Sequence, residues 1–97
     1  MKQLTIIISQ DLEGEVQELI SEANVDCYVK QPDAYGISHR CKSTIGDNMP
    51  WEATLLILGG EEKLLVELAD KIKASMANKE YTPCLRMMLT PVDRLWY

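Results

Sequence analysis

"WEATLLILGGEEKLLVELADKIKASMANK", residues 51–79, holds the strand and helix that decide the fold of this chain. Residues 51–60 form an apolar run of strand length that ends in two glycines. Residues 61–79 then predict a helix, because apolar residues recur at helical spacing, with acid first and lysines later, as the helix dipole favours. The apolar stripe of this helix comprises Leu64, Leu65, Leu68, Ala69, Ile72 and Met76.

The first half of the chain repeats this order of strand and helix. "LTIIIS" (4–9) predicts a strand buried on both faces, and Ser9 offers an N-cap to a helix that Asn24 ends. "VDCYVK" (25–30) alternates in polarity and predicts a half-exposed strand, and "PCLRMMLTP" (83–91) predicts a last strand. The apolar stripe of the first helix comprises Leu12, Val16, Leu19, Ile20 and Ala23.

The order strand, helix, strand, long connection, strand, helix, strand predicts one α+β domain over residues 1–97. We expect the ferredoxin-like architecture, a four-stranded antiparallel sheet with both helices on one face. The other face would remain uncovered and apolar, so the chain is expected to associate with copies of itself.

Composition excludes several classes of partner. The net charge of −5 opposes binding to duplex nucleic acid, and no apolar run approaches the roughly 20 residues that insert into a membrane. The three cysteines are an odd, unclustered set, which argues against a secreted disulfide framework and favours the cytoplasm. Cys27 and Cys84 are expected to be small core residues.

Residues 31–50 have no period, and structureless connections longer than about 12–15 residues usually carry function. Within them, His39, Arg40 and Lys42 predict a local anion site, with a solvated basic tip or a patch for a protein partner as equal alternatives. His39 and Cys41 are also competent metal ligands, but two ligands are too few for a closed site. The sequence contains no evident acid–base pair or activated nucleophile, so we expect no enzymatic activity.

Further cations lie in the second half of the chain. Lys79 follows the second helix, Arg86 lies on the last predicted strand and Arg94 lies in the tail. An arginine on an apolar strand needs an acidic partner, such as one across a subunit contact, or a ligand. Trp96 and Tyr97 are interpreted as packing anchors at such a contact.

In layout and length the whole chain resembles the PII-like signalling proteins. The resemblance covers "KQLTIIIS", "DLEGEVQELISEANV", the 31–50 connection, "ATLLILGGEEKLLVELADKIK" and "CLRMMLTPVDRLW". It implies a homotrimer that binds adenine nucleotides between subunits, requires no cofactor, and engages a target protein, such as a membrane transporter or an enzyme, through a long T-loop. It also implies ligand contacts at Gly36, Lys79, Arg86 and Arg94.

The chain differs from the family pattern in two places, so it resembles a divergent member of the family. "MANKEYTPC" (76–84) lacks the family's glycine-rich phosphate loop, and the paired-arginine ending is absent. The expected ligand is therefore an adenine nucleotide or another small anion. The CutA family shares the trimeric fold and is the alternative, a divalent-metal-binding or metal-tolerance protein that would use His39 and Cys41.

Overall fold

A computed structural model describes residues 1–25, 27–36, 51–81 and 83–96 of the chain. Four strands and two α-helices follow in the predicted order. The elements are β1 (Lys2–Ser9), a 3₁₀ turn (Gln10–Leu12), α1 (Glu13–Glu22), β2 (Tyr28–Gly36), β3 (Trp51–Gly60), α2 (Glu62–Ala77) and β4 (Leu85–Pro91).

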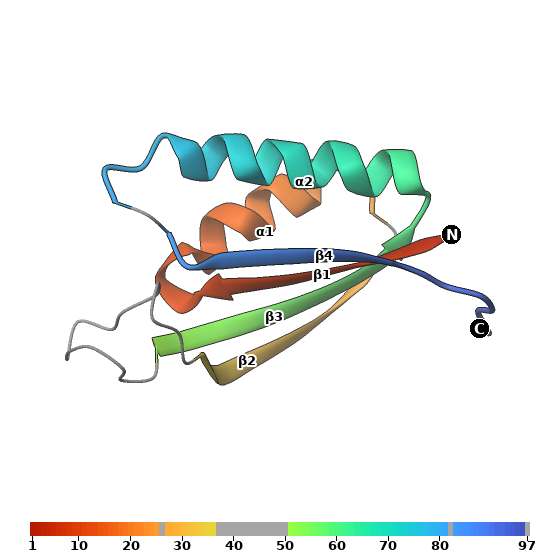
Figure 1. Cartoon of the computed structure of the whole chain (residues 1–97), viewed down its shortest axis with the longest axis horizontal. Helices are drawn as coiled ribbons and strands as arrows, with labels where there is room; N and C mark the ends of the chain where they lie inside the picture. Colours follow the sequence, from red (N-terminus) through yellow and green to blue (C-terminus); the bar gives the residue numbers. More distant parts are fainter. Residues whose placement is uncertain (26, 37–50, 82, 97) are drawn as a thin grey trace.

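The strands form one antiparallel sheet in the order β2-β3-β1-β4, with both helices on the same face (Figure 1). β1 and β3 are the central strands and pair over their full length, from Lys2 opposite Gly60 to Ser9 opposite Ala53. This architecture confirms the predicted ferredoxin-like class. Neither helix in the described residues is long and apolar enough to cross a membrane.

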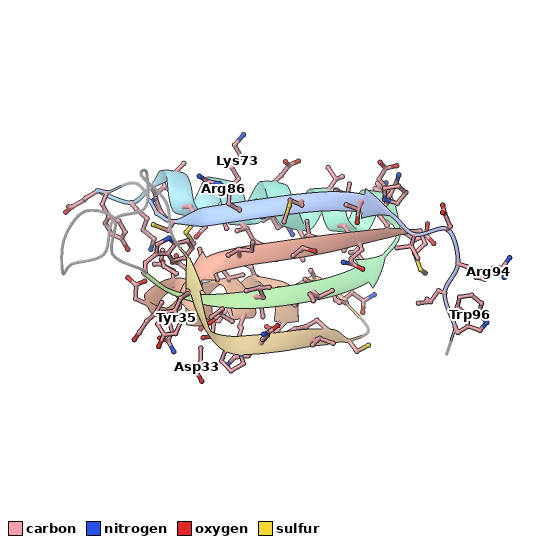
Figure 2. All side chains as sticks on the ribbon, turned by 60° about the horizontal axis from the view of Figure 1, so that its bottom comes forward. Asp33, Tyr35, Lys73, Arg86, Arg94 and Trp96 are labelled. Carbon is pink, nitrogen blue, oxygen red and sulfur yellow. The ribbon has the colours of Figure 1, made fainter. Side chains whose placement is uncertain are left out.

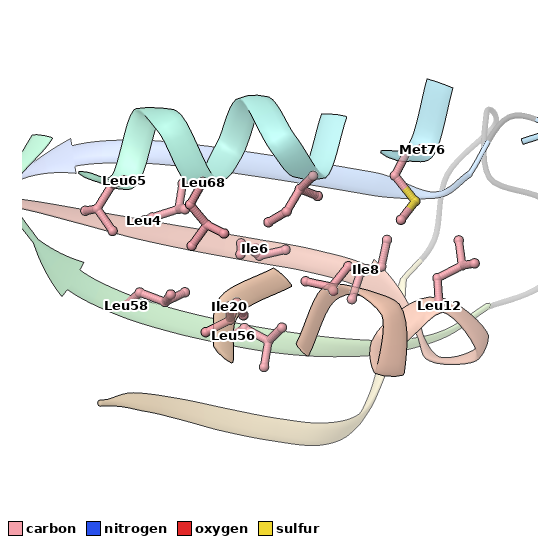
Figure 3. Close-up of a cluster of buried hydrophobic side chains, with 12 residues drawn as sticks. Leu4, Ile6, Ile8, Leu12, Ile20, Leu56, Leu58, Leu65, Leu68 and Met76 are labelled. Carbon is pink, nitrogen blue, oxygen red and sulfur yellow. The ribbon is translucent and has the colours of Figure 1, made fainter. Parts of the chain in front are cut away.

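The core lies between the sheet and the two helices (Figure 3). In β1, buried and partly exposed residues alternate, so Leu4, Ile6 and Ile8 face the helices while Thr5 and Ile7 face away. The prediction that this strand is buried on both faces is therefore wrong for the single chain. The core cluster comprises Leu4, Ile6, Ile8, Leu12, Val16, Ile20, Leu56, Leu58, Leu65, Leu68, Ile72 and Met76.

Both helices follow the predicted apolar stripes. α1 ends just before Asn24, which adopts a positive φ of 37°, a conformation that asparagine tolerates better than most residues and that cannot continue a helix. α2 begins with acid at Glu62, and every fully buried residue that it contributes belongs to its predicted stripe.

β2 differs most from the prediction. It begins at Tyr28 and continues to Gly36, so six residues assigned to the unpatterned connection belong to a strand. The pairing with β3 is interrupted between Gln31 and Ala34, where Pro32 has no N–H to donate and Asp33 has a φ of 61°. The alternation predicted a strand only as far as Lys30, because the later residues of this edge strand are mostly exposed and follow no such pattern.

A polar contact ties this edge strand to the first turn of α1. The carboxylate of Glu13 forms an ion pair with Lys30 of β2, and it accepts a hydrogen bond of 3.0 Å from the hydroxyl of Thr54 in β3. The Thr54 side chain is fully buried, and the Glu13 side chain is 13% exposed. A buried carboxylate requires such partners, so these contacts hold β2, β3 and α1 in one arrangement.

Candidate functional site

One end of the sheet gathers several of the residues predicted to bind a ligand. Gly36 ends β2, Trp51 begins β3 and Leu85 begins β4, and all three lie at the end where α2 also finishes (Figure 1). We call this the loop end of the sheet. The residues between Gly36 and Trp51 lie outside the described part of the chain.

Gly36 is the cross-strand partner of Trp51. The Trp51 indole lies directly against the Gly36 backbone, because a β-carbon added at Gly36 would be 2.2 Å from Cε2 and 2.6 Å from Nε1 of the ring. The Trp51 N–H is buried and has no hydrogen-bond acceptor among the described residues. Glycine is therefore required at this position by the packing of the tryptophan, a role that the sequence did not reveal.

Lys79 lies just beyond α2 at the same end. Its ammonium forms a 2.7 Å ion pair with Glu15 of α1, and the other carboxylate oxygen of Glu15 accepts a 2.9 Å hydrogen bond from Ser75. The bond from Lys79 is the main reason that the pKa of Glu15 lies below 4.5, with Ser75 acting in the same direction. The same contact raises the pKa of Lys79 above 10.5. The predicted ligand cation thus already holds a carboxylate.

Arg86 lies in β4 near the loop end, and it faces away from the helices (Figure 2). Its pairing partner in β1 is Ile7, which lies on the open face. The guanidinium is exposed and donates a 2.8 Å hydrogen bond to the carbonyl of Leu85. Most of its donors therefore remain available for a ligand or for a second chain.

Arg94 lies beyond the opposite end of β4. Arg86 is five residues from the strand end at Pro91, a span of about 17 Å at 3.3 Å per residue. The guanidinium of Arg94 stacks over the Trp96 ring, 5.3 Å from its centroid. Figure 2 shows Arg86 and Arg94 at opposite ends of the sheet. The predicted cations of one chain therefore do not converge on one ligand.

The remaining predicted site residues, His39, Arg40, Cys41 and Lys42, lie outside the described residues. Within the described ranges, no three His, Cys, Asp or Glu side chains gather as metal ligands do. The expectation that Cys27 and Cys84 are core residues is wrong: Cys27 is exposed and Cys84 is half-buried. Cys27 precedes β2 and Cys84 precedes β4, and these two strands are the edges of the sheet.

The face of the sheet opposite the helices is open in the single chain, as predicted. Apolar and polar side chains are mixed along the strands of this face, and apolar residues lie on the edge strands as well as on the central ones. The register places Val29, Ile57, Thr5 and Met88 side by side in one row across the four strands. Val29 and Met88, on the edge strands, are 62% and 49% exposed. Apolar residues of this open face include Ile7, Val29, Leu55, Ile57 and Met88.

No protein-family profile and no curated protein sequence matches the chain. Several solved protein structures, however, match the fold of the chain. The structure of CPII, a nitrogen regulatory PII-like protein from Thiomonas intermedia K12 bound to ADP, AMP and bicarbonate, matches with a TM-score of 0.66 and 17% identity, over 98% of this chain and 94% of the other. CPII bound to ADP, AMP and acetate, and CPII bound to ADP and bicarbonate, both match with TM-scores of 0.64. The predicted resemblance to PII-like proteins is thus confirmed as a likeness of fold.

Proposed function

We propose that this chain is a divergent PII-like regulatory protein without enzymatic activity. It assembles as a homotrimer, binds an adenine nucleotide or a small anion between its subunits, and controls a target protein through the segment between β2 and β3. The observation that carries this proposal is the likeness of fold to CPII, which spans nearly the whole of both chains and whose structures contain ADP with AMP, bicarbonate or acetate.

The positions of the predicted site residues support a site that several copies share. Gly36, Lys79 and Arg86 belong to the loop end of one chain, whereas Arg94 lies beyond the other end of its sheet. The predicted contacts of one chain therefore do not all reach one ligand, so a neighbouring copy would complete the site. We assign the phosphate or carboxylate of the ligand to Arg86 and Lys79.

Ligand binding at Lys79 involves competition with Glu15. An anion that approaches Lys79 meets the carboxylate already bound there, and it must displace that carboxylate or share the ammonium with it. Binding therefore loosens the contact between α1 and the chain beyond α2. Arg40 and Lys42 would add contacts in the ligand-bound state, and a ligand that contacts them only in one conformation of their segment would favour that conformation. A target protein would then distinguish the two conformations.

The test is isothermal calorimetry of the full chain with ATP, ADP, AMP and bicarbonate. At least one of these ligands is expected to bind, and Arg86→Ala is expected to weaken binding by about tenfold, the loss of roughly one charge-assisted hydrogen bond. Lys63→Ala is the matched control, since it removes one exposed positive charge at the other end of the molecule. Binding of none of the four ligands would refute the proposal, and equal losses in both variants would refute the site.

Zinc and copper titrations of the wild type and of His39→Ala/Cys41→Ala test the metal-binding alternative. A metal affinity that depends on these two residues, in a chain that binds no nucleotide or anion, would favour a CutA-like protein. Light scattering of the same samples tests the trimer.

A further inference from the structure

A small apolar groove lies between α2 and β4, on the helix side of the sheet. Its volume is about 230 Å³, below the roughly 300–1,000 Å³ of sites that hold drug-sized ligands, so it accommodates side chains and is too small for a nucleotide. Apolar side chains form most of its lining, and Asp70 and Lys73 of α2 are its charged groups. The lining residues are Leu4, Leu65, Val66, Ala69, Asp70, Lys73, Met87 and Leu89.

The residues that follow β4, 92–96, expose large apolar side chains. We call them the tail. Trp96 is 74% exposed, the largest exposed fraction among the described large hydrophobic side chains, and Leu95 is 49% exposed. Arg94 stacks on the Trp96 ring, so the two side chains form one unit. An exposed leucine–tryptophan pair beside a stacked arginine has the composition of an interface anchor.

The tail cannot easily reach the groove of its own chain. The N–H of Val92 donates a 3.2 Å hydrogen bond to the carbonyl of Met1, and this extends the β1–β4 pairing one residue beyond Lys2 and Pro91. The chain therefore continues in the direction of β4 as it leaves the sheet, and Figure 1 shows the tail pointing away from the body of the domain.

We propose that the α2–β4 groove of one copy binds the tail of a second copy, with Leu95 and Trp96 against its apolar lining. The charges are complementary, because the tail carries Asp93 and Arg94 and the groove carries Asp70 and Lys73. The occupant is thus a second copy of this chain, bound by an apolar anchor and an adjacent pair of opposite charges. This proposal rests on the self-association within the proposed function, and it adds a contact outside the open face.

Sedimentation velocity over a concentration series tests the anchor. Trp96→Ala is expected to weaken association by about 30-fold, as the loss of a buried interface tryptophan does. Because this side chain is exposed in the single chain, circular dichroism should show an unchanged fold. Association equal to that of the wild type would overturn the proposal. Lower stability of Trp96→Ala with unchanged association would also overturn it, since the tail would then pack on its own chain.

A charge exchange tests the groove itself. Asp70→Arg and Arg94→Asp are each expected to weaken association, and the double variant is expected to recover most of it. An Asp70→Arg variant that associates like the wild type, while Trp96→Ala does not, would place the tail on another surface and overturn the proposal.

Fluorescence provides an independent readout, because the chain has two tryptophans. In a Trp51→Phe background, Trp96 is the remaining indole, and its quenching by iodide should fall as the chain associates. Quenching that does not change with association would overturn the proposal. ADP calorimetry on Trp96→Ala separates this result from the proposed function: a variant that associates and binds ADP as the wild type does refutes the tail contact and leaves the proposed function standing.

Discussion

Replacing Gly36 with alanine tests whether the tryptophan at the loop end determines the residue opposite it. An alanine β-carbon would lie 2.2 Å from Cε2, 2.3 Å from Cζ2 and 2.6 Å from Nε1 of Trp51. All three distances are far below van der Waals contact, so the indole must leave its position or β2 must separate from β3. Forced overpacking of this kind costs about 1–3 kcal/mol, and we expect the free energy of unfolding to fall by that amount.

Gly59→Ala is the matched control, because Gly59 also lies in a strand, β3, and a β-carbon there meets nothing within 4 Å. It should be neutral or slightly stabilising, since alanine restricts the unfolded chain more than glycine does. Urea unfolding followed by far-UV circular dichroism, at one fixed protein concentration, measures both variants. For a domain of this size each kcal/mol corresponds to roughly 4–8 °C in melting temperature.

A double-mutant cycle assigns the cause of the loss at Gly36. In a Trp51→Ala background the added methyl group has room, so Gly36→Ala should there be neutral or stabilising. Equal stability changes for Gly36→Ala and Gly59→Ala would refute the reasoning. A loss at Gly36 that persists without the tryptophan would refute it as well, because the cause would then lie in the backbone.

Three further predictions follow from the polar contacts and the helices. Because the pKa of Glu15 is lowered and that of Lys79 is raised, their ion pair stabilises the fold at pH values between 4.5 and 10.5. The wild type should lose this stabilisation as the pH falls below 4.5 or rises above 10.5. In thermal melts across that range, the melting temperature of Glu15→Gln should depend less on pH. Thr54→Val removes a hydrogen bond to the buried carboxylate of Glu13, so the free energy of unfolding measured in urea should fall by about 1.5–3 kcal/mol. An unchanged free energy would mean that the ion pair with Lys30 alone satisfies that carboxylate. Gly14→Ala in α1 should stabilise by about 0.5–1 kcal/mol in the same assay, because a β-carbon there meets nothing, and a loss would contradict the helix assignment.

The parts of the fold that are buried on one side could be predicted from the sequence. β3, α1 and α2 have apolar residues at the spacing of their element, so their positions, and hence the order of the whole sheet, followed from the pattern. β2 could not be located in the same way. As an edge strand it exposes both faces for much of its length, and the irregularity at Pro32 and Asp33 looks like the start of a loop.

The candidate site residues were chosen by residue type, and their contacts could not be predicted. The positive charges of Lys79 and Arg86 follow from residue type alone. The ion pair of Lys79 with Glu15 joins segments from opposite halves of the chain, so no local sequence pattern predicts it. The contact between Gly36 and Trp51 is of the same kind. The register of β2 and β3 places these two residues opposite each other. That register depends on the irregularity at Pro32 and Asp33, which the sequence pattern did not predict.

The irregularity in β2 also bears on whether one sheet can pair edge to edge with another. The outer edge of β2 is divided at Pro32 and Asp33 into two stretches of four and three residues, Tyr28–Gln31 and Ala34–Gly36, and a new strand cannot pair continuously along both. β4 offers a regular outer edge of seven residues, Leu85–Pro91. Growth of a sheet from copy to copy requires two free edges, and this chain supplies one that is intact. Continuous edge-to-edge pairing of one sheet with the next is thereby hindered at the β2 edge.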